Sequence, residues 1–241
     1  VKWTNGIKNR IRMTGPVDCQ TSAYRPAYFL SMNDDTVGEV IPGSSDLPTV
    51  AGAGLELEWQ GGTIPLHDLR FRSLQRALSV GNGVSLTLSH SQILSCDVGV
   101  QALAHSTVAL RNALLVDVAD TTFALADEAE LRGEHLTLHR VGKFRSGTYG
   151  IPTGALDLAN SLLVAVTNLV VEPYSDWRKV FVERGDAGVF AAAGHGNHYL
   201  PVHSPFRRAG DPDIDSSLLN ELRRTSTHPP GIISAAILQG E

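Results

Sequence analysis

The feature that most constrains the fold of this sequence is an apolar pattern that returns about every 22 residues between Ile64 and Val171. Five segments carry it, each with apolar residues at its first and third positions: 64–68, 86–90, 108–112, 129–133 and 156–160. Alternation with a period of two is typical of a β-strand, and internal repeats of about this length are typical of solenoids. The repeat therefore predicts a stack of short strands.

The fifth position of each segment holds a residue type that tolerates a left-handed backbone: Asp68, His90, Asn112, Gly133 and Asn160. We therefore expect every strand to end at the same bend. Stacked strands are about 4.8 Å apart, so these side chains would form a ladder along the stack. The ladder has two interpretations, a structural row of hydrogen bonds and a line of polar groups that contacts an extended glycan. We favour the structural row, because stacked Asn side chains stabilise neighbouring strands.

A helical repeat of similar length is the main alternative to a stack of strands. Twenty-two residues leave no room for two helices and their turns, and the units are rich in Val, Thr and Ser. A leucine-rich repeat would need a recurring Asn motif that is absent from this sequence. The sequence thus predicts an all-β fold, a right-handed parallel β-helix. We expect one domain over residues 1–241, with a repeat core at 64–171 and an irregular closing segment at 172–241.

Two segments interrupt the strand pattern and a third predicts a helix. Residues 41–54 are rich in Pro, Gly, Ser and Ala and read as a long early loop, and residues 143–153 read as an insertion between coils. Insertions in solenoids form loops on one face, often the binding face. Asp215 is a plausible N-cap for a short C-terminal α-helix over 216–224, which places three leucines on one face: Leu218, Leu219 and Leu222.

The run from Tyr24 to Glu39, with Asn33-Asp34-Asp35-Thr36-Val37-Gly38, resembles a segment of large secreted bacterial β-helix proteins. The tail around 196–207 and 220–230 resembles the segment that closes the repeat array in such proteins. The resemblance is to the pectate-lyase-like β-helix superfamily. It implies an extracellular or cell-surface location and a larger secreted chain that continues into, or stacks on, further β structure. No stretch resembles a catalytic motif of a lyase or glycosidase, so no catalytic residue is carried over.

The composition limits the kinds of partner that the chain is expected to bind. The net charge is −5 with no basic run, so nucleic acid is not an expected partner. No apolar stretch reaches the roughly 18 residues that a membrane span requires. Two cysteines, Cys19 and Cys96, give no disulfide framework, and we expect two free or buried thiols.

Acidic and histidine-rich segments are candidates for metal sites, and no other cofactor is expected. Asp34, Asp35 and Glu39 could bind Ca²⁺, but a hydrogen-bonded turn is the favoured interpretation. The segment 211–215 lacks the Gly and the distant Glu of a calcium loop. A third group, near the end of the repeat array, consists of His195, His198 and His203. Zinc binding by this group would need a further ligand.

Two functions remain open. The first is a non-catalytic structural, carbohydrate-binding or surface-interaction module, whose partner would be a glycan or a neighbouring protein subunit. The second is a polysaccharide lyase or glycoside hydrolase, which needs clustered groups on one face, whereas Asp97, Asp117, Asp120 and Asp157 share no evident column. The aromatic residues that could contact a glycan, through the apolar faces of their rings, are Tyr149, Tyr174 and Trp177. If the chain does more than act as a rigid spacer, we expect the residues responsible to lie in the loops 41–54 and 143–153.

Overall fold

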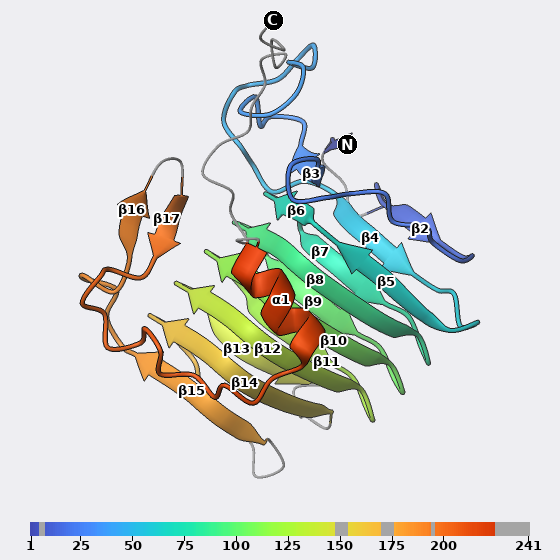
Figure 1. The fold of residues 1–241 in the computed structure, drawn as a ribbon. Coiled ribbons are helices and arrows are strands. Elements are labelled where there is room, and N and C mark those ends of the chain that lie inside the picture. The colour runs from blue at the N-terminus through green and yellow to red at the C-terminus, as the bar shows by residue number, and fades with distance from the viewer. Residues whose placement is uncertain (5–7, 148–153, 170–175, 194–195, 225–241) are drawn as a thin grey trace, which may run out of the picture.

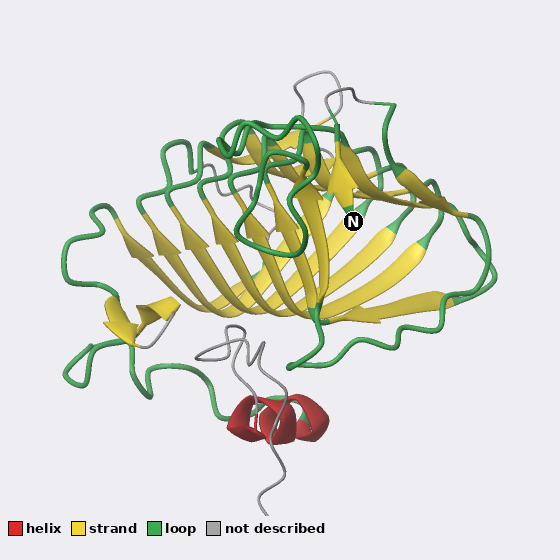
Figure 2. Cartoon of the chain, turned by 90° about the horizontal axis from the view of Figure 1, so that it is seen from above, coloured by secondary structure: helices red, strands yellow, loops and turns green. Residues whose placement is uncertain are grey.

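The computed structural model describes residues 1–4, 8–147, 154–169, 176–193 and 196–224. The described chain is a parallel β-solenoid of about five turns with one short C-terminal helix (Figures 1 and 2). The predicted all-β parallel β-helix with a long early loop and a C-terminal helix is confirmed. Among the described residues, no helix is long and apolar enough to cross a membrane.

One side of the solenoid is a nine-stranded sheet in which every pairing is parallel. Its strands follow the order β1-β3-β6-β8-β10-β12-β14-β15, and β5 also pairs with β8. The strands are β1 (Lys2–Trp3), β3 (Ala27–Ser31), β5 (Thr63–His67), β6 (Leu69–Arg72), β8 (Ser85–Leu94), β10 (Thr107–Val116), β12 (Glu130–His139), β14 (Ala155–Val164) and β15 (Trp177–Glu183).

The opposite side is a six-stranded parallel sheet. Its strands are β2 (Ile11–Met13), β4 (Ala53–Leu57), β7 (Arg76–Val80), β9 (Val98–Ala102), β11 (Thr121–Leu125) and β13 (Lys143–Gly147). The core lies between the two sheets and is mainly aliphatic, with Phe123 and Phe144 in edge-to-face contact at 5.6 Å. Because each coil supplies equivalent side chains to the layer above and below, the core is continuous along the stack.

The register corrects one member of the predicted repeat. Val108 pairs with Leu86 on one side and with Leu131 on the other, so the fourth unit begins at Leu131 and not at residue 129. Gly133 resembles a bend residue because glycine readily adopts positive φ. In the structure Gly133 instead faces the core, where a Cβ would lie 2.5 Å from Leu136 Cδ1. Close packing, not a turn, explains this glycine.

The predicted bend lies within the four ten-residue strands rather than at their ends, and in the preceding coil it separates β5 from β6. Its residues have φ between 48° and 54°, and they are Asp68, His90, Asn112, His135 and Asn160. A second column of positive φ follows five residues later in each coil, at Ser73, Ser95, Asp117, Arg140 and Ala165. The sequence pattern missed this second bend, because Ser, Arg and Ala rarely adopt such a backbone.

The early loop joins β3 to β4, and its last residues already belong to the solenoid. Ala51 is fully buried and its N–H donates to Ser73 O at 3.0 Å, so the predicted loop over 41–54 ends before Gly54. The described part of the predicted insertion over 143–153 is strand β13, whose Phe144 lies in the core. That prediction was therefore wrong for 143–147, and 148–153 lie outside the described residues.

The C-terminal part folds back across the outside of the large sheet. An antiparallel hairpin of β16 (Ala191–Ala193) and β17 (Gly196–Tyr199) precedes helix α1 (Ser216–Arg224). The predicted N-cap is confirmed, since Asp215 Oδ1 accepts from the N–H groups of Ser217 and Leu218 at 2.9 and 3.0 Å. Leu218 is fully buried, and α1 lies outside the solenoid below the large sheet in Figure 2.

Candidate ligand-binding pocket

Side chains on the outer face of the large sheet are unusually well covered. Leu114, Thr137, Leu162 and Phe181 occupy one register column on β10, β12, β14 and β15. They point away from the core because the alternate residues of the same strands fill it. Leu114 and Leu162 are nevertheless buried, since the segment from the hairpin to α1 crosses this face (Figures 1 and 2).

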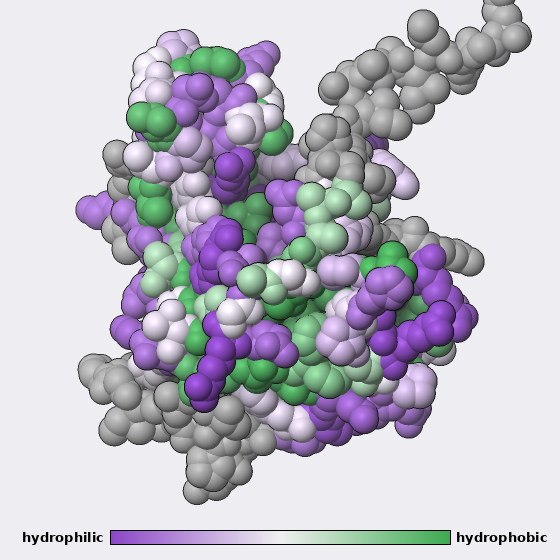
Figure 3. All heavy atoms as spheres, turned by 90° about the vertical axis from the view of Figure 1, so that its left-hand side faces the viewer, coloured by the Kyte–Doolittle hydropathy of each residue, from purple (hydrophilic) through white to green (hydrophobic). Residues whose placement is uncertain are grey.

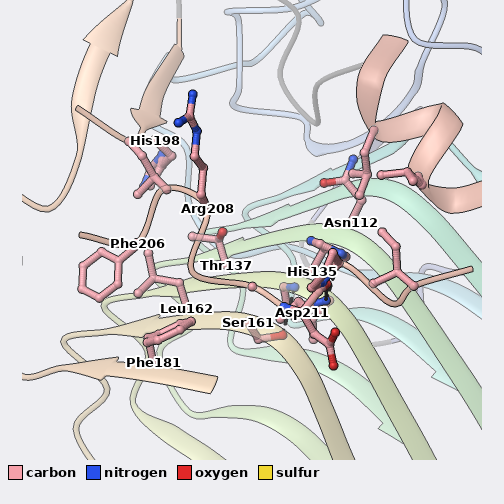
Figure 4. Close-up of a pocket in the computed structure, with 18 of the residues that line it drawn as sticks. Asn112, His135, Thr137, Ser161, Leu162, Phe181, His198, Phe206, Arg208 and Asp211 are labelled. Atoms are coloured by element: carbon pink, nitrogen blue, oxygen red, sulfur yellow. Dashed lines mark hydrogen bonds between the residues drawn. The ribbon is translucent and has the colours of Figure 1, made fainter. Parts of the chain in front are cut away.

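A pocket of about 590 Å³ lies between this face and the segment that crosses it (Figure 4). This volume is within the usual range for small-molecule sites. Its apolar end is formed by Leu162, Phe181, Phe190, Leu200 and Phe206, and its helix side by Ile214, Leu219 and Leu222. Its polar residues include Asn112, His135, Asn160, His198, Arg208 and Asp211. Seen from the hairpin side, apolar surface lies between hydrophilic borders (Figure 3).

Asn160 fixes the polar end of the pocket. Its Oδ1 accepts from Asp211 N at 2.6 Å, and its Nδ2 donates to Asp211 O at 3.2 Å and lies 3.4 Å from His135 Nε2. Because Nδ2 is the donor, His135 Nε2 is the acceptor and the neutral ring carries its proton on Nδ1. Burial lowers the pKa of His135, while the charge of Glu134 acts in the opposite direction. His135 is therefore neutral at pH 7.

His90 and Asn112, which belong to the first column of positive φ (68, 90, 112, 135 and 160), connect the sheet to helix α1. Asn112 Nδ2 lies 2.8 Å from His90 Nδ1, and His90 Nε2 lies 3.0 Å from Glu221 Oε2 on α1. The carboxylate can only accept, so His90 donates from Nε2 and accepts at Nδ1. The side chain of Asp68, the first residue of this column, contacts His67 Nδ1 at 2.9 Å within its own coil. Asn112 and Asn160 thus link neighbouring coils of the sheet. His90 and Asn160 also attach the C-terminal segment to the sheet.

The hairpin side of the pocket contains a histidine pair. His139, at the end of β12, places Nδ1 2.9 Å from His198 Nε2 and Nε2 3.3 Å from Asp186 Oδ2. Phe190 packs against both rings, with centroids 5.0 Å from His139 and 4.9 Å from His198. Burial lowers the pKa of His139; the hydrogen bond that the ring donates to Asp186 raises this pKa, and the charge of Arg140 lowers it further.

The predicted zinc group is not assembled in the described residues. His198 contacts His139, a partner that the sequence pattern did not single out, and His203 is exposed. His195 lies outside the described residues. Over the described ranges, no group of three or more His, Cys, Asp or Glu side chains is arranged to hold a metal ion.

The predicted calcium residues lie beside cations and hydrogen-bond donors. Asp34 is fully buried, accepts from Thr36 N at 3.1 Å and lies 3.3 Å from Arg72 Nη1. Lys2 Nζ lies 3.5 Å from Asp35 Oδ1 and donates to the backbone carbonyl of Glu39 at 2.7 Å. These contacts account for the turn without an ion, and calcium binding there stays a prediction.

The remaining predicted contacts are dispersed. Trp177 pairs in register with Leu158 and packs edge-on against Phe144 at 5.5 Å, so its partly buried ring packs against the core. Tyr149 and Tyr174 lie outside the described residues. Cys19 and Cys96 are free, as expected, and burial raises the pKa of Cys96 to about 12.

Two of the acidic residues do share a column, contrary to the prediction. Asp120 N donates to Asp97 O at 3.0 Å, so the two residues lie on neighbouring coils. Burial, and then the charge of Asp120, raises the pKa of the Asp97 carboxyl. Lys143 Nζ donates to Asp120 Oδ1 at 3.2 Å. None of the three lines the pocket.

No family model, curated protein or solved structure matches this chain.

Proposed function

We propose that the chain is a non-catalytic β-solenoid module that binds a small, mainly apolar ligand in the pocket on the outer face of the large sheet. The observation that supports this is the pocket itself, which combines an aromatic end with a small set of oriented polar groups. The solenoid provides a rigid wall, because β10, β12 and β14, which line it, are each paired with a strand on both sides. We place the module in a secreted or cell-surface bacterial protein, as the sequence resemblance implies.

The polar groups of the pocket are suited to orienting a ligand rather than to transforming it. Both ends of the Asn160 amide bond to Asp211, and His135 Nε2 lies beside the same amide. The Asp211 carboxylate accepts from Asp213 N at 3.0 Å. Groups fixed in this way present defined donors and acceptors, but a general acid or base must also exchange a proton with its substrate.

The apolar end favours a hydrophobic ligand over a glycan. Its aromatic residues are phenylalanines, and Phe181 and Phe206 pack against each other at 5.7 Å with their planes tilted by 55°. A sugar face is best recognised by an exposed, flat Trp or Tyr ring with a polar edge. The sequence leads us to expect a glycan as one possible partner. The test below therefore includes glycans as the alternative ligand.

The test is a fluorescence titration with N-phenyl-1-naphthylamine, a neutral aromatic probe, beside a glycan array. Thr137→Trp fills the pocket from β12, and Thr107→Trp places the same side chain at an exposed position of the same sheet. We expect the wild type and Thr107→Trp to bind the probe equally and Thr137→Trp to lose at least tenfold in affinity. Equal binding by all three, or glycan binding that Thr137→Trp leaves intact, would contradict the proposal.

A second candidate function, glycoside hydrolysis, is supported by Asp97 and Asp120. Neighbouring coils are about 4.8 Å apart, which approaches the separation of about 5 Å between the carboxyl groups of retaining glycosidases. One carboxyl with a raised pKa beside a second carboxylate is the pattern of an acid and a nucleophile. A reducing-sugar assay on neutral and acidic polysaccharides tests it. Activity that survives in Asp97→Asn would exclude this pair.

A further inference from the structure

We propose that the hairpin β16–β17 is a pH-sensitive latch on the pocket, released when the His139–His198 pair takes up protons. This inference rests on the proposed function, because it describes how ligand access to the same pocket is regulated. The hairpin and its flanks supply Phe190, His198 and Leu200 to the pocket wall. Figure 4 shows His198 on this strand, facing the pocket from the side opposite Asn112 and His135.

His139 connects the solenoid to the hairpin and to the loop that precedes it. His139 is nearly buried, with 8% of its side chain exposed, and it contacts Asp186 before the hairpin, Phe190 at its base and His198 on β17. The three rings, of His139, Phe190 and His198, lie within 5.1 Å of one another by their centroids. A change at His139 therefore acts on the preceding loop and on the hairpin together.

The geometry of the pair limits how many protons it can hold. Asp186 accepts, so His139 carries a proton on Nε2, and Nδ1 accepts from the Nε2–H of His198. At 2.9 Å only one proton fits between Nδ1 and Nε2. One excess proton can be accommodated, either on His198 Nδ1 without rearrangement or on His139 Nδ1 if His198 changes tautomer. Two excess protons place two N–H groups and two cations face to face.

Charges on every neighbouring element affect the pair. Asp186 is about half exposed and lies 3.3 Å from His139 Nε2. Arg140, which follows the last residue of β12, forms a two-pronged ion pair with Asp117 at 2.7 and 3.0 Å and lies 3.9 Å from Asp186. The carboxylates favour the protonated ring, whereas burial and Arg140 disfavour it, with burial the largest effect.

The sign of the pH dependence follows from the lowered pKa of His139. A released histidine has a pKa of about 6.5, so the released state binds more protons than the latched state below that pH. The ratio of latched to released molecules then falls by up to about tenfold per pH unit below about pH 6.5. Below the lowered pKa that His139 has in the latched state, the ratio of latched to released molecules becomes constant.

The experiment measures hydrogen exchange of the hairpin and probe affinity at pH 7.5 and pH 5.0. Exchange rates are corrected for the intrinsic effect of pH, and the neutral N-phenyl-1-naphthylamine keeps its charge over this range. The variant His139→Gln can still donate to Asp186 and accept from His198, but it cannot be protonated. His105→Gln, at an exposed histidine paired with Glu128, is the matched control.

In the wild type and in His105→Gln we expect the corrected exchange of 191–193 and 196–199 to rise at pH 5.0, by up to about 30-fold, with a weaker affinity for the probe. In His139→Gln both quantities should be the same at the two pH values. Unchanged hairpin protection in the wild type, or an equal response in His139→Gln, would overturn the latch. Absence of probe binding at pH 7.5 would instead overturn the proposed function, and hydrogen exchange alone would then decide whether the latch exists.

Discussion

Replacing Asn160 by Leu should detach the C-terminal segment from the solenoid. The Asn160 amide provides both hydrogen bonds to the backbone of Asp211, at 2.6 and 3.2 Å, and Leu can provide neither. Leaving a buried N–H and a buried C=O without partners costs about 1–3 kcal/mol each. Asp211 is only half-buried, so water replaces part of the loss. We therefore expect the docking free energy to fall by about 2–4 kcal/mol.

Two measurements separate local detachment from global unfolding. Hydrogen exchange of 211–224 should rise by the factor that corresponds to this free energy, about 30- to 1,000-fold, while exchange of β8 and β10 changes little. The control Asn82→Leu alters an exposed turn residue and should leave both regions unchanged. Gly210→Ala gives an independent check, because its Cβ would lie 3.0 Å from Asn160 Oδ1 and should weaken docking less than Asn160→Leu. If Asn160→Leu changed exchange by less than about threefold, the attachment would not depend on this amide.

Three further changes test the fold. Gly133→Ala should lower stability by about 1–3 kcal/mol in urea unfolding, because the added Cβ meets Leu136; an unchanged midpoint would disprove the close packing. Asp97→Asn should raise the melting temperature at pH 7, where the raised pKa makes the ionised carboxyl unfavourable, and this gain should vanish near pH 3, where Asp97 is protonated in folded and unfolded chains alike. A gain that persisted at pH 3 would point to another cause. Asp215→Ala should weaken α1 through loss of the N-cap, measurable as faster exchange of the helix amides, and Asp215→Ser should restore most of the protection.

The repeat and its first bend could be predicted from sequence because both depend on local residue types. Alternating apolar residues specify which face of each strand is buried, and Asn112 or Asn160 tolerates positive φ. The same reasoning failed at Gly133, since a glycine needed for close packing has the same sequence signature as one needed for a turn. The second bend at Arg140 and Ala165 had no such signature, because the stack imposes the backbone there.

The pocket was missed because it forms between segments that are far apart in the chain. Phe181, Phe206 and Leu222 reach the outer face of the sheet only after the chain folds back on itself. One signal was present in the sequence. The stretches 113–116 and 162–164 are continuously apolar, and strands of this kind are buried on both faces. Such strands predict that something covers the outer face, but not what it is.

The most direct test of the account is a crystal structure of the protein with N-phenyl-1-naphthylamine. We predict that the aromatic rings of the probe lie between Phe181 and Leu222, with its amine toward His135 and Asn160. The strands 107–116 and 130–139 should pair in the register that places Asn112 beside His135. Probe density elsewhere on the molecule, or an outer sheet face that is not crossed by 200–224, would contradict the account.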